Sequence, residues 1–163
     1  MPVSPEVFRE SLSQFCTGVT IVTFADADGY HGLTVNAFSS LSLDPPLILI
    51  CIDKKTTSHD CLTCCDAFVV NILSREQEDL AARFANWRLS SADRFADSIY
   101  ELTKTGLPAF RENLGYLECL RRDAIEAGDH TIVIGEVETS ASSDARPPLL
   151  YFRSQFRELA AGV

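Results

Sequence analysis

Short segments rich in β-branched and aliphatic residues recur along this chain, and turn sequences separate them. This pattern constrains the fold more than any other feature, because such side chains pack well on a pleated sheet and regularly spaced short strands favour barrels. The expected strands run over residues 17–24, 30–36, 37–43, 47–52, 68–73, 116–122, 130–139 and 149–152. Six to eight strands against three helices predict a mainly β fold with peripheral helices, built as a closed or nearly closed antiparallel barrel.

Two turn sequences predict hairpins between neighbouring strands. Asp26-Ala27-Asp28-Gly29 combines Asp, which bonds its own backbone, with Gly, which adopts a positive φ. Residues 126–129 contain Gly and Asp in the same role and predict a second hairpin. Segment 47–52 is wholly apolar and follows the stop sequence Asp44-Pro45-Pro46, so we expect it to be a strand buried on both faces.

The first expected helix covers residues 4–15, and a second covers residues 58–65. Ser4 is a good N-cap, and Pro5 is tolerated at the first helical position because its missing N–H would be unpaired there. Apolar residues then recur at spacings of four and three, which predicts a stripe that faces a core. The stripe consists of Phe8, Leu12 and Phe15.

The third expected helix begins after Ser74, which forms a capping box with Gln77. We expect its buried side to carry Leu80, Phe84 and Trp87. Residues 88–113 lack clear periodicity, so we expect a long excursion with short helical or irregular pieces there.

Composition limits the class of protein. A chain of 163 residues, 46% of them hydrophobic, is long enough for one domain over residues 1–163. The net charge of −9 predicts no binding to nucleic acid or anionic lipid, because both depend on basic patches. The longest aliphatic run, residues 47–52, is far too short to span a membrane. We find no secretion signal, so we expect a cytoplasmic protein with free cysteine thiols.

A cluster of polar residues directly after segment 47–52 is a candidate phosphate site. Ammonium groups, hydroxyls and free backbone N–H groups at the start of a helix are suited to binding a phosphate. The cluster contains Asp53, Lys54, Lys55, Thr57 and Ser58. The alternative is that the two lysines are ordinary solvated surface residues.

Two further features could bind a ligand. Segment 34–40 alternates small, polar and apolar groups, so it could offer donors to a flat heterocycle, although a half-buried strand with exposed hydroxyls has the same pattern. His130 follows the turn Gly128-Asp129 and could orient an amide or release a proton, although a surface histidine would also fit there.

The three cysteines Cys61, Cys64 and Cys65 would share one face of a helix. A closed structural metal site needs four ligands, and the usual second pair of Cys or His is missing, so we expect buried small thiols and no metal. The common nucleotide-binding and serine hydrolase motifs are also missing from the sequence.

In combination these segments resemble the flavin reductase family of the FMN-binding split-barrel fold, the short-chain reductases of two-component flavin-dependent monooxygenases. The resemblance extends from Phe8 to Phe156. It is carried by residues 15–23 (FCTGVTIVT), 32–47 (GLTVNAFSSLSLDPPL), 68–74 (FVVNILS), 128–132 (GDHTI) and 147–153 (PPLLYFR). Ser154 stands where the family often has Gly, and Phe156 stands where it often has Tyr.

The resemblance implies a split barrel that forms a homodimer and holds FMN or FAD near the subunit interface. It implies that His130 lies on the nicotinamide side and that Tyr151 lies near the flavin. It assigns the flavin ring to Thr34, Val35, Asn36, Ala37, Ser39, Ser40 and Cys51, and the ribityl phosphate to Asp53, Lys54, Lys55, Thr57 and Ser58.

The implied function is an NAD(P)H:flavin oxidoreductase that transfers a hydride from NADH or NADPH to FMN or FAD and supplies a partner monooxygenase. Stacking the two rings is the main requirement for this reaction, which agrees with a sequence that shows no obvious catalytic dyad. Two alternatives are a noncatalytic flavin-binding or sensing module and a split-barrel flavin oxidase with another acceptor. An oxidase of the pyridoxamine-phosphate type would need a more basic phosphate cage than Lys54 and Lys55 provide.

Overall fold

The computed structural model describes residues 3–159. Its helices are α1 (Pro5–Leu12), α2 (His59–Cys64), α3 (Glu78–Ala85) and α4 (Ser91–Phe95), with a 3-10 turn η1 (Arg75–Gln77) before α3. Its strands are β1 (Thr17–Gly18), β2 (Thr20–Asp26), β3 (Gly29–Val35), β4 (Phe38–Leu43), β5 (Pro46–Asp53), β6 (Ala67–Ile72), β7 (Tyr100–Leu102), β8 (Pro108–Phe110), β9 (Gly115–Ala127), β10 (His130–Ser142), β11 (Leu150–Phe152) and β12 (Gln155–Arg157).

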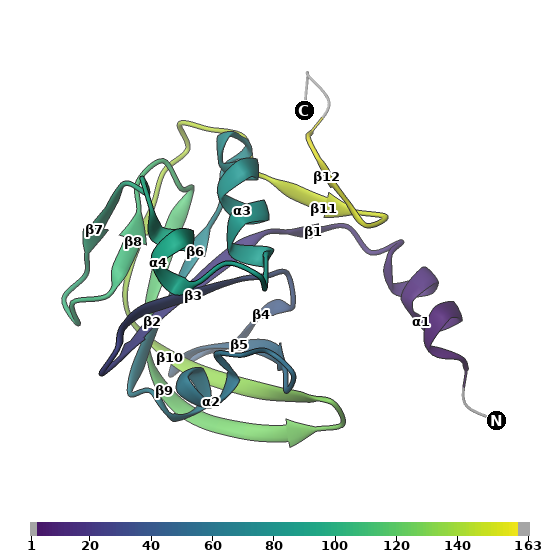
Figure 1. Ribbon diagram of the computed structural model, residues 1–163, viewed down its shortest axis with the longest axis horizontal. Helices are drawn as coiled ribbons and strands as arrows, with labels where there is room; N and C mark the ends of the chain where they lie inside the picture. The colour runs from purple at the N-terminus through teal and green to yellow at the C-terminus, as the bar shows by residue number, and fades with distance from the viewer. Residues whose placement is uncertain (1–2, 160–163) are drawn as a thin grey trace.

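Seven strands form one antiparallel sheet in the order β3-β2-β6-β9-β10-β5-β4 (Figure 1). The two edge strands, β3 and β4, follow one another in the chain, so the sheet curls back toward its own edge. This arrangement confirms the predicted antiparallel split barrel. Both predicted hairpins are confirmed as well: Asp26 pairs with Gly29 between β2 and β3, and His130 pairs with Ala127 between β9 and β10.

The main core fills the barrel interior. It draws buried residues from β2, β3, β5, β6, β9 and β10, and Leu62 of α2 completes it. A second core lies outside the barrel, where α3 packs against β2 and Phe84 meets Ile21 and Phe110. Strand β6 is buried on both faces, because Val69 packs in a third cluster with Leu107 on the outside of the barrel.

Several expectations are wrong in detail. Residues 3–159 form twelve strands and four α-helices, because short strand pairs form where the sequence shows no periodicity. Residues 88–113 contain the short helix α4, as expected, but also the β7–β8 pair, which was not expected. Strand β12 pairs with β11 beyond the last predicted strand. Strand β5 buries only alternate residues completely, since one face lines the barrel interior and the other is half-buried.

The apolar stripe of α1 does not face a core within this chain. The helix begins as predicted, with the Ser4 Oγ accepting from the N–H of Val7, but it projects away from the barrel (Figure 1). Phe8 and Leu12 are more than half exposed, and Phe15 is 76% exposed. An amphipathic pattern indicates that the apolar face of a helix is stabilised by burial, but it does not identify the surface that buries this face.

Trp87 was expected on the buried side of α3 and is instead 74% exposed. Helix α3 ends at Ala85, and Asn86 has an extended conformation, so the helical register that would bury Trp87 stops before reaching it. Ala81 and Phe84 are the buried residues of this helix. Within the described residues, no helix is long and apolar enough to cross a membrane.

Phe84 and Trp87 therefore provide a matched test of the packing of α3. Replacing Phe84 by Ala should lower the free energy of unfolding by about 3–5 kcal/mol, because it leaves a cavity between Phe95 and Phe110. Replacing Trp87 by Ala should change the free energy of unfolding by no more than about 0.5 kcal/mol. Urea unfolding without added ligand measures both effects, and equal losses would contradict the described packing.

Candidate functional site

A cleft runs along β3 beneath the C-terminal half of α3, and it consists of two neighbouring cavities of about 390 and 380 Å³. Thr34 and Ala85 line both cavities, so the two cavities adjoin one another. The first is lined by Val19, Thr34, Asn36, Ala82, Ala85, Tyr151, Ser154, Gln155 and Phe156. The second is lined by Leu33, Thr34, Asp53, Lys55, Thr56, Thr57, Phe84, Ala85, Trp87 and Arg94.

The position of α3 over β3 sets the width of this cleft. The Thr34 hydroxyl donates a hydrogen bond of 2.7 Å to the carbonyl of Ala81, which ties the strand to the helix. At Gly32 a Cβ would lie only 2.6 Å from the Phe84 ring, so the close approach depends on glycine. Thr34, predicted from the sequence as a ring-binding residue, thus has a structural contact as well.

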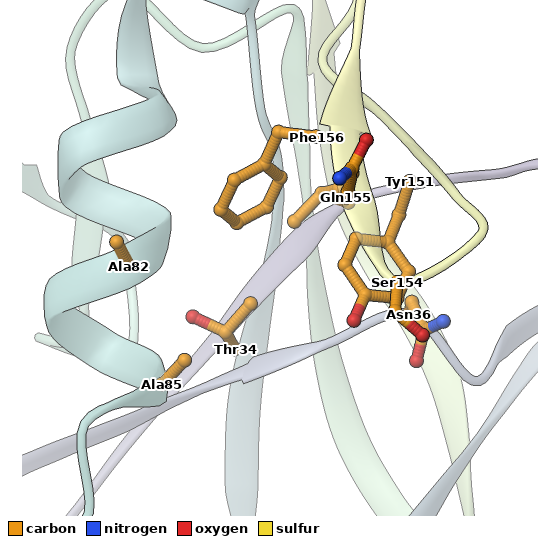
Figure 2. A pocket seen from close by; sticks show the side chains of 9 residues that line it. Thr34, Asn36, Ala82, Ala85, Tyr151, Ser154, Gln155 and Phe156 are labelled. Carbon is orange, nitrogen blue, oxygen red and sulfur yellow. The ribbon is translucent and has the colours of Figure 1, made fainter.

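Aromatic side chains from the C-terminal strands form one wall of the first cavity. The rings of Tyr151 and Phe156 meet at an angle of 64°, with their centroids 5.7 Å apart. Figure 2 shows them on one side of the cavity, with Ala82 and Ala85 of α3 on the other and Thr34 between them. A flat, mostly apolar group would fit between an aromatic wall and small side chains.

The second cavity contains two cationic side chains. Lys55 stands in the turn after β5, where the Asp53 carboxylate accepts from its N–H at 2.8 Å and shapes the turn. Arg94 of α4 is only 6% exposed. The combination of Lys55, Arg94 and the Thr57 hydroxyl is suited to an anion such as a phosphate.

Arg94 is buried without a neutralising charge among its hydrogen-bond partners. Its guanidinium donates to the backbone carbonyls of Gly32, at 3.0 Å, and Asn86, at 3.1 Å. Its Nε is buried and has no partner in the described chain. Burial lowers the pKa of Arg94 below its ordinary value, so an anion in the cavity would stabilise the charged form.

The sequence analysis missed Arg94, and it missed that Phe156 and Gln155 line the cleft. The capping box in which Ser90 and Asp93 bond reciprocally could have predicted the short helix α4, which carries Arg94. No comparable signal marks Gln155, because its place depends on the pairing of β12 with β11.

The predicted ring residues fall into two groups. Thr34, Asn36 and Tyr151 line the first cavity. Val35 is buried in the barrel core, Cys51 is half-buried on β5, and Ala37, Ser39 and Ser40 are exposed on or before β4. The N–H of Cys51 donates to the carbonyl of Ala37 at 3.0 Å, and burial raises the pKa of the Cys51 thiol.

The predicted phosphate residues also separate. Asp53, Lys55 and Thr57 line the second cavity. Lys54 instead forms an ion pair with Glu126 at 3.1 Å, and Ser58 is buried at the start of α2.

His130 of β10 pairs with Asp53 on the adjacent strand β5, although it lines neither cavity. Its side chain is 43% exposed, and its Nδ1 lies 2.8 Å from the Asp129 carboxylate. The hydrogen bond from His130 lowers the pKa of Asp129. The ring is therefore oriented by an ionised neighbour, on the strand next to the one that carries Asp53.

Comparisons with known proteins give consistent matches. The model of the flavin reductase like domain matches residues 12–160. The reductase subunit of a flavin-dependent monooxygenase from Mycobacterium tuberculosis is 35% identical over 156 residues, which cover 94% of this chain and 82% of that protein. A protein from Rhizobium meliloti that is named a probable flavin reductase is 41% identical over 140 residues. These residues cover 85% of this chain but only 44% of that protein.

The solved structures include an NADH:FAD oxidoreductase from Streptomyces globisporus C-1027 in complex with NAD and FAD fragments. It superimposes with a TM-score of 0.90 at 36% sequence identity. The superposition covers 100% of this chain and 99% of the other.

Proposed function

The chain belongs to the flavin reductase like domain family, and on that premise we propose that it transfers a hydride from NADH or NADPH to FMN or FAD. The reduced flavin would then serve a partner monooxygenase. The observation that carries this proposal is the pair of adjoining cavities, one walled by aromatic rings and the other lined by Lys55 and Arg94. A flavin has the same polarity, with a flat ring at one end and a phosphate at the other.

The residues of the cleft fit such a ligand. Each cavity has a size typical of small-molecule sites. Lys55 and Arg94 would hold the phosphate, and the unpartnered Nε of Arg94 is a donor that an anion could use. Thr34, Asn36 and Tyr151 would hold the ring.

When bound, the flavin supplies the atom that accepts the hydride. The chain's own contribution is to bind and orient the two reactants and to exclude water. Tyr151 and Phe156 close one side of the ring cavity, and the hydrogen bond from Thr34 to Ala81 holds its opposite wall in place. His130, beside Asp53, would orient the nicotinamide.

Two supporting points concern the setting of the reaction. The matched Mycobacterium tuberculosis relative is named as a monooxygenase reductase subunit, which supports a monooxygenase partner here. All six cysteines are free, and Cys16 and Cys64 are exposed, which fits a reducing compartment such as the cytoplasm.

Anaerobic bleaching of bound flavin by NADH would separate this reductase from a noncatalytic flavin-binding module.

The first prediction from the proposed function tests the binding of the flavin phosphate in the second cavity. Replacing Lys55 by Ala should raise the dissociation constant of FMN roughly ten- to a hundredfold, because charge-assisted hydrogen bonds contribute about 1.5–3 kcal/mol. Riboflavin lacks the phosphate, so its affinity should stay nearly unchanged. Replacing Lys54 by Ala is the matched control and should have a smaller effect, since Lys54 is paired with Glu126. Fluorescence titration measures the dissociation constants of FMN and riboflavin for the parent protein and for both variants. If Lys55→Ala weakens the binding of FMN and riboflavin equally, a phosphate role for Lys55 is excluded.

The second prediction concerns His130. Changing His130 to Ala should leave FMN affinity nearly unchanged and lower kcat/KM for the reduced nicotinamide roughly ten- to a hundredfold. Residual activity should remain measurable, because hydride transfer needs no obligatory protein acid. Anaerobic rapid mixing follows the flavin absorbance directly. An unaltered hydride-transfer rate together with unaltered nicotinamide affinity would show that His130 is only a surface residue.

The third prediction concerns the homodimer. The exposed apolar residues Phe8 and Leu12 of α1 would be covered by a second copy, which also explains why this helix has no core contact of its own. The protein should therefore elute with twice its chain mass of 18.0 kDa in size-exclusion chromatography with light scattering. Replacing Phe8 and Leu12 together by Glu should shift it toward the monomer.

The control for this experiment is Leu102→Glu on β7, because Leu102 is also exposed but belongs to a different surface. This variant should keep the mass of the parent protein. A parent protein that is monomeric, or a double variant that remains fully dimeric, would rule out this role for α1.

A further inference from the structure

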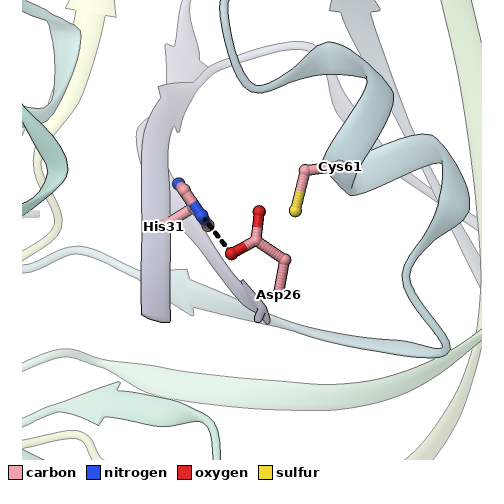
Figure 3. Close-up of side chains that lie close together, drawn as sticks. All are labelled: Asp26, His31 and Cys61. Carbon is pink, nitrogen blue, oxygen red and sulfur yellow. Dashed lines mark ion pairs between the residues drawn. The ribbon is translucent and has the colours of Figure 1, made fainter. Parts of the chain in front are cut away.

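Three potential metal ligands from three separate elements meet outside the proposed flavin cleft. Asp26 ends β2, His31 lies on β3 and Cys61 lies on α2, and their ligand atoms all lie within 4.8 Å of one another. Figure 3 shows the carboxylate of Asp26 between the imidazole of His31 and the sulfur of Cys61. The proposed flavin chemistry uses none of these three side chains.

His31 is held so that its Nε2 faces this cluster. Its ring stacks on Phe24 with centroids 5.7 Å apart, and its Nδ1 hydrogen-bonds the Ser91 hydroxyl at 3.0 Å. Nε2 itself is buried and lies 2.9 Å from the Asp26 Oδ1, and Figure 3 marks this contact as an ion pair. An imidazole that is held through its other nitrogen and directs Nε2 at a carboxylate is placed as a metal ligand would be.

Asp26 supplies a negative charge to the cluster. The hydrogen bond from His31, followed by that from the N–H of Asp28, which donates to Oδ1 at 2.8 Å, lowers the pKa of Asp26. Burial, followed by the hydrogen bond and the charge of Asp26, raises the pKa of the Cys61 thiol to about 12. Cys61 therefore keeps its proton at neutral pH unless a cation takes the proton's place.

We propose that Asp26, His31 and Cys61 bind one divalent cation of the Zn²⁺ type, with water completing the coordination. One thiolate, one imidazole and one carboxylate form a mixed donor set that suits Zn²⁺ or Co²⁺ and not Mg²⁺ or Ca²⁺, which prefer oxygen. Metal–ligand bonds of about 2.0–2.3 Å place tetrahedral ligand atoms roughly 3.5 Å apart. Small rotations of the exposed Asp26 and the half-buried Cys61 would bring the ligand atoms to that spacing.

Binding exchanges a proton for the metal. The S–H bond of Cys61 breaks, a sulfur–metal bond forms, and the proton passes to solvent. The charged or titratable groups around the thiol are Asp26, His31, Cys64 and Cys65, and Asp26 is already ionised at neutral pH. The bound metal would tie α2 to the β2–β3 hairpin, and the bond of Ser91 to His31 would extend this connection to α4.

The test is a titration of the flavin-free, full-length protein with Co²⁺ alone. We expect one Co²⁺ per chain, thiolate-to-cobalt charge-transfer absorption, d–d bands of tetrahedral intensity and release of close to one proton per metal at neutral pH. Cys61→Ser should abolish the charge-transfer band. Asp26→Asn, which keeps the acceptor for the Asp28 N–H, and His31→Ala should each weaken binding at least tenfold.

Cys64→Ser is the matched control, because Cys64 lies on the same helix but is exposed and outside the cluster. It should leave the spectrum and the affinity unchanged. Circular dichroism checks that each variant is folded, and Asp26→Asn remains informative if His31→Ala is not. The absence of a thiolate band, or a band that depends on Cys64 and not on Cys61, would overturn the proposal. Neither result depends on flavin binding, so the proposed reductase function is judged separately.

Discussion

Helix α3 can lie directly on β3 because residue 32 is glycine, and the whole cleft depends on that contact. A Cβ at position 32 would come within 2.6 Å of the Phe84 ring and would displace the helix. With the helix in place, Thr34 bonds the Ala81 carbonyl and Arg94 bonds the Gly32 carbonyl. One close packing contact thus sets the width of the first cavity and brings the buried guanidinium of Arg94 to the second.

The charge distribution of the chain makes that buried guanidinium important. A net charge of −9 repels an anionic flavin or nicotinamide at long range, so binding needs local cations in a partly desolvated site. Lys55 and Arg94 meet this need within one cavity, whereas Lys54 is compensated by Glu126. Arg94 is the stronger contributor in principle, because burial leaves its charge less screened than that of an exposed lysine.

Helix α4 connects the cleft with the Asp26–His31–Cys61 cluster. Its Ser91 bonds His31, and its Arg94 bonds the neighbouring residue, Gly32. A cation held by the cluster would therefore act on the same strand that lines the cleft, through hydrogen bonds that the structure already contains. The metal site proposed at Cys61 of α2 would have a structural role. The turn with Lys55, which precedes α2 in the chain, has a proposed ligand-binding role.

The sequence alone predicted most strands of the barrel and both hairpins, because β-branched periodicity and turn residues act over a few neighbouring residues. The split-barrel family was predicted from the resemblance of its motifs, and β7, β8 and β12 were not predicted. The sequence also located Thr34, Asn36, Lys55, Thr57 and Tyr151, all of which line the cleft. Only the tertiary structure decided that Lys54 turns to Glu126, that Trp87 is exposed and that α1 has no core contact within its own chain. It alone brought Arg94 beneath β3 and Cys61 beside His31. These outcomes depend on contacts between residues distant in the sequence, and such contacts are set by how the barrel closes and not by any local pattern.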